Sequence, residues 1–218
     1  MSGATTLSDG TGLKQSAHYQ IPLSRAGAWS FTSYFNASPG AEHPALSGMV
    51  TTDQVATYFR GTTLLNPAAS MNSVQTDYDP TRDAAGNLSL KVDLVGDKYG
   101  MEWGLMVTAG LRTDTTATIG AFVDDNGAGT TFGAQAYWQL VAFTGTSVTI
   151  DINHCTTSGV SYTNLMNSGA QTLIGSGRMS VANTTTVNRY LEITTVGTFT
   201  LATFAVQFCR NKIAGQVF

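Results

Sequence analysis

The sequence is poor in charge. Only 11% of its 218 residues are Asp, Glu, Lys or Arg, against roughly 25% in ordinary soluble domains. Gly, Ser, Thr and Ala fill the gap, with frequent Val, Ile, Tyr and Phe. This mixture favours strands and argues against disorder, so the composition predicts an all-β protein. So few charges suit a subunit whose surface is covered by partners; an ordinary β-sandwich with neutral loops is the alternative.

Several targeting and binding signals are also missing. The net charge of −3 comes without clustered Lys and Arg, which argues against a nucleic-acid reader. No apolar run approaches the roughly 20 residues of a membrane span, and the N-terminus lacks a signal-peptide pattern. We therefore expect a chain made in a cytoplasm, used without processing and without a membrane partner. Cys155 and Cys209 are too few for a disulfide scaffold and are expected to be buried free thiols, with a pair between them as the alternative.

Motifs for catalysis or metal binding are not found. His18, His43 and His154 lie far apart, without the spacing of a metal site. His154 and Cys155 are adjacent, which places their side chains on opposite faces of a strand. The run Asp124–Gly127 lacks the alternating carboxylates of a calcium loop and is better explained as a solvated turn. The sequence therefore predicts no enzyme, no catalytic residue, no cofactor and no metal.

The stretch from Ala28 to Gly61 predicts a strand, a short helix and a second strand. Trp29, Phe31 and Phe35 share one parity, which is the two-residue period of a strand with one buried face. Proline and glycine then break this strand, and a short helix is expected within Pro44–Met49. Because so short a helix needs a sheet to cover, the pattern predicts an antiparallel sheet with one face capped.

The cleanest strand pattern in the sequence is Asn87–Val95. Four apolar residues face one side and are expected to be buried: Leu88, Leu90, Val92 and Leu94. The polar residues between them face water: Ser89, Lys91 and Asp93. An antiparallel sheet built this way has one dry and one wet face.

A polar stretch, Asp79–Asn87, separates this strand from the one expected at Ala68–Tyr78. Its Asp-Pro and Gly-Asn pairs mark a hairpin tip. Nine residues are more than a tight hairpin needs, so we expect this tip to reach out of its own lobe. The candidates for contacts with a neighbouring subunit are Asp79, Arg82, Asp83 and Asn87.

Small residues mark two further segments. Met1–Gly12 is expected to be a flexible arm that orders against a neighbour. Thr113–Thr131 is expected to be a linker, which divides the chain into lobes at 1–115 and 132–218 with 116–131 between them. The second lobe shows alternating strands and turn signals typical of a β-sandwich; its strands are expected at Gly133–Phe143, Ser147–Cys155, Arg189–Thr195 and Leu201–Cys209.

Four stretches carry a family resemblance. They read WSFTSYFNASPGAEHPALSGMVTTDQVATYFRGTT, YGMEWGLMVTAGLRTDT, TTFGAQAYWQLVAFTGTSVTI and FAVQFCRN. Together they resemble the major tail proteins, or tail tube proteins, of long-tailed actinobacterial bacteriophages, over most of the chain from about Leu13 onward. Only MSGATTLSDGTG precedes the matching part, so a first strand is expected to be absent or differently built.

The resemblance implies a structural virion protein. It implies a tail-tube-like β-barrel or sandwich in the N-terminal lobe and an outward-facing β-sandwich in the C-terminal lobe. Six copies would form a ring, and stacked rings would conduct the phage DNA without sequence-specific binding. The implied partners are other copies and the tape measure, tail terminator and distal tail proteins, with assembly in the bacterial host cytoplasm. Ser89, Lys91 and Asp93 would face the lumen.

Two other classes fit the same composition. A capsid or tail decoration protein would form trimers or isolated knobs instead of stacked rings. A carbohydrate-binding adhesin would use Tyr137, Trp138 and loop carboxylates of the second lobe, although Tyr137 and Trp138 are better explained as a core or interface pair.

Overall fold

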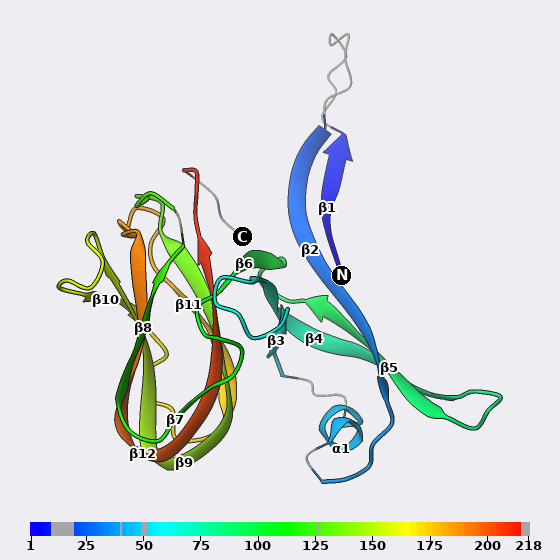
Figure 1. Ribbon diagram of the computed structural model, residues 1–218. Helices are drawn as coiled ribbons and strands as arrows, with labels where there is room; N and C mark the ends of the chain where they lie inside the picture. Colours follow the sequence, from blue (N-terminus) through cyan, green and yellow to red (C-terminus); the bar gives the residue numbers. More distant parts are fainter. Residues whose placement is uncertain (10–19, 40, 49–51, 126, 215–218) are drawn as a thin grey trace, which may run out of the picture. The chain divides into compact units, whose positions relative to one another are not determined.

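The computed structural model describes residues 1–9, 20–39, 41–48, 52–125 and 127–214, and it is nearly all β (Figure 1). The expected fold class, all-β with one short helix, is confirmed. The elements are β1 (Ser2–Asp9), β2 (Gln20–Tyr34), α1 (Glu42–Leu46), β3 (Gln54–Phe59), β4 (Pro67–Arg82), β5 (Leu88–Gly96), β6 (Glu102–Met106), β7 (Arg112–Asp114), β8 (Thr118–Asp124), β9 (Ala134–Cys155), β10 (Thr163–Asn167), β11 (Gly175–Ser180) and β12 (Tyr190–Arg210).

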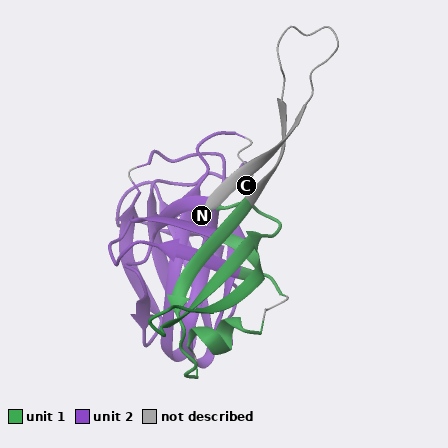
Figure 2. Cartoon of the chain, turned by 90° about the vertical axis from the view of Figure 1, so that its right-hand side faces the viewer, with its two compact units in different colours: residues 1–54, 71–101, 218 green, residues 55–70, 102–217 purple. Residues whose placement is uncertain are grey.

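The chain forms two compact units that interleave in the sequence (Figure 2). Unit 1 contains residues 1–54 and 71–101, and unit 2 contains residues 55–70 and 102–217. Strand β4 contributes residues to both units. The lobes expected at 1–115 and 132–218 therefore differ from these units. A run of small residues predicted the division into lobes, whereas strand pairing decides which segments fold together.

The linker expected at Thr113–Thr131 is wrong. This segment contains β7 and β8, and both strands pair with β12. Arg112 fastens it, because its guanidinium donates two hydrogen bonds to Asp114 (2.9 and 2.8 Å) and one to the carbonyl of Ile193 (2.7 Å). Threonine and small residues fit a pleated strand as well as a linker, and the partner strand lies some 70 residues further along the sequence.

Unit 1 is an antiparallel sheet in the order β1-β2-β5-β4. Phe31 lies opposite Val92 and Trp29 opposite Leu94, so the expected apolar parity is present. Leu90 and Val92 are fully buried, but Leu88, which was expected to be buried, is 36% exposed and Phe31 is 37% exposed. The expectation of a buried Phe31 is wrong, since a two-residue period shows which side chains share a face and not whether that face is covered.

Strand β1 replaces the flexible arm expected at the N-terminus. Ser2–Asp9 pairs antiparallel with Gln20–Ala28 of β2, with an irregularity between Thr6 and Leu7. The last three residues of the arm, 10–12, lie outside the described residues.

Helix α1 packs beside β4 within unit 1. The ring of His43 lies 4.6 Å from that of Phe35, and its Nδ1 is 2.6 Å from the hydroxyl of Tyr78. Gln75 donates a hydrogen bond to the carbonyl of Leu46 (2.8 Å). The helix thus begins two residues before the expected Pro44 and ends at Leu46.

Unit 2 is organised around the pairing of β9 with β12, which runs from Tyr190–Cys155 to Arg210–Ala134. The four strands expected here merge into two long strands, β9 and β12. The pairing continues through the expected turns, because bulges at Thr198–Leu201 and Thr203–Phe204 accommodate the irregular residues. Strands β8, β10 and β11 flank the pair. The core side chains come mainly from β9 and β12 and include Trp138, Leu140, Ile150, Ile152, Leu191, Ile193, Phe204 and Val206.

Candidate assembly surfaces

The polar residues predicted on β5 lie on one face of the unit 1 sheet. Lys91 stands opposite Thr32 on β2 and Asp79 on β4, and Asp93 stands opposite Ser30 and Asp77. Directly opposed like charges destabilise a sheet, so Asp77 beside Asp93 needs a nearby cation. Lys91 supplies it: its Nζ lies 2.8 Å from Asp93.

The pKa values on this face follow from that ion pair. The hydrogen bond from Lys91 lowers the pKa of Asp93, and the same bond raises the pKa of Lys91. Both groups are therefore charged at neutral pH. With Asp77 and Asp79 added, the face carries more negative than positive charge, and it also presents Tyr34, which is 80% exposed and stands opposite Ser89.

The net charge of the chain falls on unit 1. This unit holds eight of the fourteen acidic and five of the eleven basic residues, which accounts for the whole net charge of −3. Unit 2 is neutral overall. An acidic surface binds polyphosphate weakly, because it releases no counterions from the nucleic acid.

The hairpin tip is shorter than the sequence predicts. Strand β4 continues to Arg82, so Asp79 is paired with Lys91 inside the sheet, and only five residues, 83–87, form the turn. Asp83 accepts hydrogen bonds from the backbone N–H and side-chain amide of Asn87, both at 2.8 Å. Arg82 donates to the carbonyl of Gly86 (3.3 Å). Arg82, Asp83 and Asn87 thus meet at an exposed, internally bonded tip, and Asp79 does not join them.

The paired strands β1 and β2 form a two-stranded ribbon. Among the described residues, Gln20–Gly27 of β2 pairs with β1 alone, and β1 pairs with no other strand. A two-stranded ribbon is marginally stable by itself in water, and unpaired strand edges are templates for further strands. The outer edges of the ribbon therefore carry backbone hydrogen-bonding groups that pair with no other strand among the described residues.

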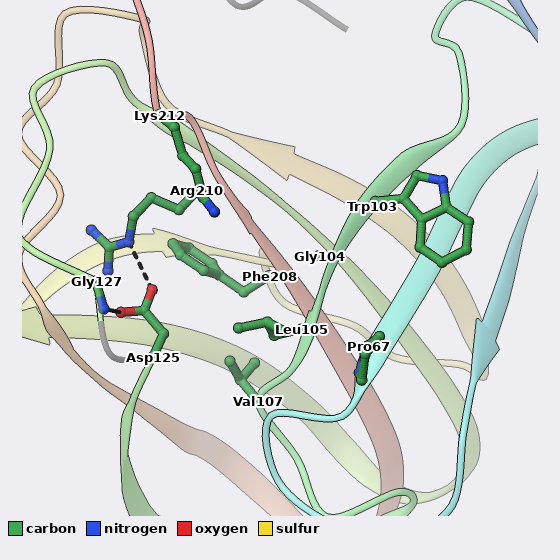
Figure 3. A pocket seen from close by; sticks show the side chains of 10 residues that line it. All are labelled: Pro67, Trp103, Gly104, Leu105, Val107, Asp125, Gly127, Phe208, Arg210 and Lys212. Atoms are coloured by element: carbon green, nitrogen blue, oxygen red, sulfur yellow. Dashed lines mark hydrogen bonds and ion pairs between the residues drawn. The ribbon is translucent and has the colours of Figure 1, made fainter.

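Unit 2 has a pocket of about 380 Å³ that the sequence did not indicate (Figure 3). Its apolar lining includes Pro67, Trp103, Leu105 and Phe208, and Trp103 is 59% exposed. The charged groups at its rim have partners: the Nε of Arg210 lies 2.7 Å from Asp125, and its Nη atoms donate to the carbonyls of Val187 and Asn188. The pocket thus presents apolar surface and engaged polar atoms.

A buried ion pair was also missed by the sequence patterns. Glu102 is fully buried and receives two hydrogen bonds from Arg178, at 3.1 and 2.8 Å. Arg178 also donates to the hydroxyl of Tyr137 (3.2 Å), and Gln207 donates to the backbone carbonyls of Ala68 and Glu102 (both 3.0 Å).

The pKa values in this cluster favour a structural role. Burial and then Glu102 raise the pKa of Tyr137. Burial alone would lower the pKa of Arg178, but its bonds to Glu102 raise it. The carboxylate of Glu102 is matched by the guanidinium of Arg178. Tyr137 is 1% and Trp138 6% exposed, so the glycan site considered at these two residues is excluded.

The thiols and His154 are also structural. Cys155 and Cys209 are both free and buried, as expected, and burial raises the pKa of Cys209. The Nδ1 of His154 accepts the backbone N–H of Asn188 (3.1 Å). Within the described part of the chain, no three His, Cys, Asp or Glu side chains gather closely enough to hold a metal ion. The described residues also include no helix long and apolar enough to cross a membrane.

Comparisons with known proteins give little support for an assignment. No protein-family model and no curated protein matches the chain. Among solved structures, the chain is similar to the Dit protein (gp 19.1) of phage SPP1, described as a paradigm of the hub adsorption apparatus in phages that infect Gram-positive bacteria. The match covers 96% of this chain and 89% of that one at 8% identity, with a TM-score of 0.29. A score this low assigns neither fold nor function.

Proposed function

We propose that the chain is a structural subunit of a phage tail, and specifically the major tail protein that forms the tube. Six copies close into a ring, rings stack into a conduit, and the DNA passes through without sequence-specific binding. The subunit has no catalytic turnover and needs no cofactor. It assembles in the host cytoplasm and meets the tape measure, terminator and distal tail proteins at the ends of the tube.

The observation that carries the proposal is the open ribbon of β1 and β2. Its unpaired edges are an aggregation hazard in a monomer, and closed symmetric assembly removes such a hazard by pairing each edge with a neighbour. The sequence resemblance to tail tube proteins favours a tail tube as this assembly. The polar, acidic face around Lys91 and Asp93 suits a hydrated lumen, since DNA that must slide requires weak attachment.

Electron microscopy and light scattering of the purified chain test the proposal. We expect six-fold rings or tubes at concentrations where hexamers form, and their loss when residues 1–9 are deleted. As a control for folding, unit 2 of this deletion variant should give an unchanged unfolding transition. A stable monomer at all concentrations would contradict the proposal, and a trimer would favour the decoration class instead.

A further inference from the structure

One face of the unit 2 sheet carries an unusual set of side chains. Strands β8, β12, β9 and β10 lie side by side in that order. Their buried side includes Ile152 opposite Ile193 and Met166. On the other side, the register aligns two rows across all four strands. One row is Phe122, Glu192, Asn153 and Asn164, and the other is Ile119, Thr194, Asp151 and Asn167.

These residues are poorly suited to the middle of a sheet. Asn and Asp are depleted in strands, yet Asp151 and Asn153 occupy β9, an interior strand between β12 and β10. Threonine or valine at these positions would favour the strand more. Residues that break a local preference are expected at functional or strained sites.

The polar groups are held in fixed orientations. Asn164 donates to Asn153 (3.2 Å), and Asn153 donates to the hydroxyl of Thr194 (3.1 Å). Thr194 in turn donates to Glu192 (3.3 Å). Four of these side chains are partly buried, so packing limits their rotamers: Asp151, Asn153, Glu192 and Thr194. A site that is already ordered before binding loses less entropy when a ligand arrives.

The chemistry of the face selects its ligand. The two rows contain two carboxylates, three amides, a hydroxyl and no Lys or Arg. At one end Arg189 lies over the ring of Tyr190, and its charge is matched by Asp124 through hydrogen bonds of 2.8 and 2.7 Å. The face therefore disfavours phosphate, sulfate and nucleic acid.

Carboxylates and amides offer paired acceptors and donors, which match neighbouring hydroxyls on a sugar ring. Phe122 is 54% and Ile119 70% exposed at the β8 edge, and they offer apolar surface to its C–H face. We propose that this face binds a neutral glycan, with Asp151, Asn153 and Glu192 holding the hydroxyls and Phe122 contacting the ring. The proposal goes beyond tube assembly and does not depend on it.

An array of immobilised neutral and acidic glycans, probed with the full chain, tests the proposal. We expect retention on neutral glycans, and then at least tenfold weaker binding of the strongest neutral glycan by Asn153→Ala and Asp151→Ala in titration calorimetry. Thr203→Val is the matched control, because this threonine is a partly buried strand residue of β12 whose hydroxyl is bonded to that of Thr113 and not to the face. Its affinity should be unchanged.

Circular dichroism shows whether each variant is folded, and Asn164→Ala on the flanking strand β10 replaces any that is not. Retention on acidic glycans alone, no retention at micromolar protein, or equal binding by the folded variants would overturn the proposal. Loss of self-association in the same variants without any glycan binding would also overturn it, since the face would then be an interface between copies.

Discussion

Replacing Arg178 by methionine leaves the buried carboxylate of Glu102 without its ion-pair partner. The side chain of Glu102 is fully buried and that of Arg178 is 10% exposed, and Arg178 donates two hydrogen bonds to Glu102. Removing one partner of a buried ion pair costs about 3–5 kcal/mol, while a whole domain is stable by roughly 5–15 kcal/mol. We expect Arg178→Met to lower the unfolding free energy of unit 2 by about 3–5 kcal/mol. The double variant with Glu102→Leu should lose less, because no unpaired charge remains buried.

The assay is urea unfolding followed by tryptophan fluorescence in a Trp29→Phe background. The two remaining tryptophans, Trp103 and Trp138, both lie in unit 2, so the midpoint then reports on that unit. Arg189→Met is the control: it breaks a pair whose side chains are 44% and 28% exposed, and it should leave the midpoint nearly unchanged because solvent-exposed pairs contribute little. A loss below about 1 kcal/mol for Arg178→Met would refute the reasoning, since the pair would then behave like a solvated surface pair.

Further outcomes follow from close packing, titration and exposure. Gly104→Ala should lower the unfolding free energy by about 1–3 kcal/mol, because an added Cβ would lie 2.3 Å from a backbone oxygen of β12, while Gly48→Ala, with nothing within 4 Å, should not. Burial and then the charge of Arg210 hold the pKa of His154 below its ordinary value, so unit 2 should lose stability as pH falls through about 6.5; a urea midpoint measured from pH 8 to 5 should show this slope, and His154→Gln should flatten it. Cys209 should react with a thiol reagent only after denaturation, since it is buried and its pKa is raised; prompt labelling of the native chain would contradict this. Shortening the turn at 83–87 to two residues should stop rings from stacking while unit 1 stays folded, and normal tubes in the microscope would exclude that role.

Sequence periodicity located the strands that alternate cleanly. The pattern of β5 gave the buried Leu90 and Val92 and the polar Lys91 and Asp93 on opposite faces, as the structure has them. This works because a strand turns successive side chains to opposite sides whatever its partner is. The composition likewise indicated the all-β class, since β-branched and aromatic residues fit a pleated sheet.

Only the tertiary structure decided how the strands combine. Ser70 and Gln207 are hydrogen-bonded although 137 positions separate them, and no local pattern announces that pairing. No local pattern predicts the pairing of Thr118–Asp124 either. Its small residues are typical of a linker, but the segment is a strand that pairs with β12. Burial also depends on what covers a face, so Phe31 remained partly exposed while Glu102 was buried with Arg178 beside it. The sequence by itself determined which side chains share a strand face, because that depends on neighbours in the chain; which faces meet depends on contacts between residues far apart.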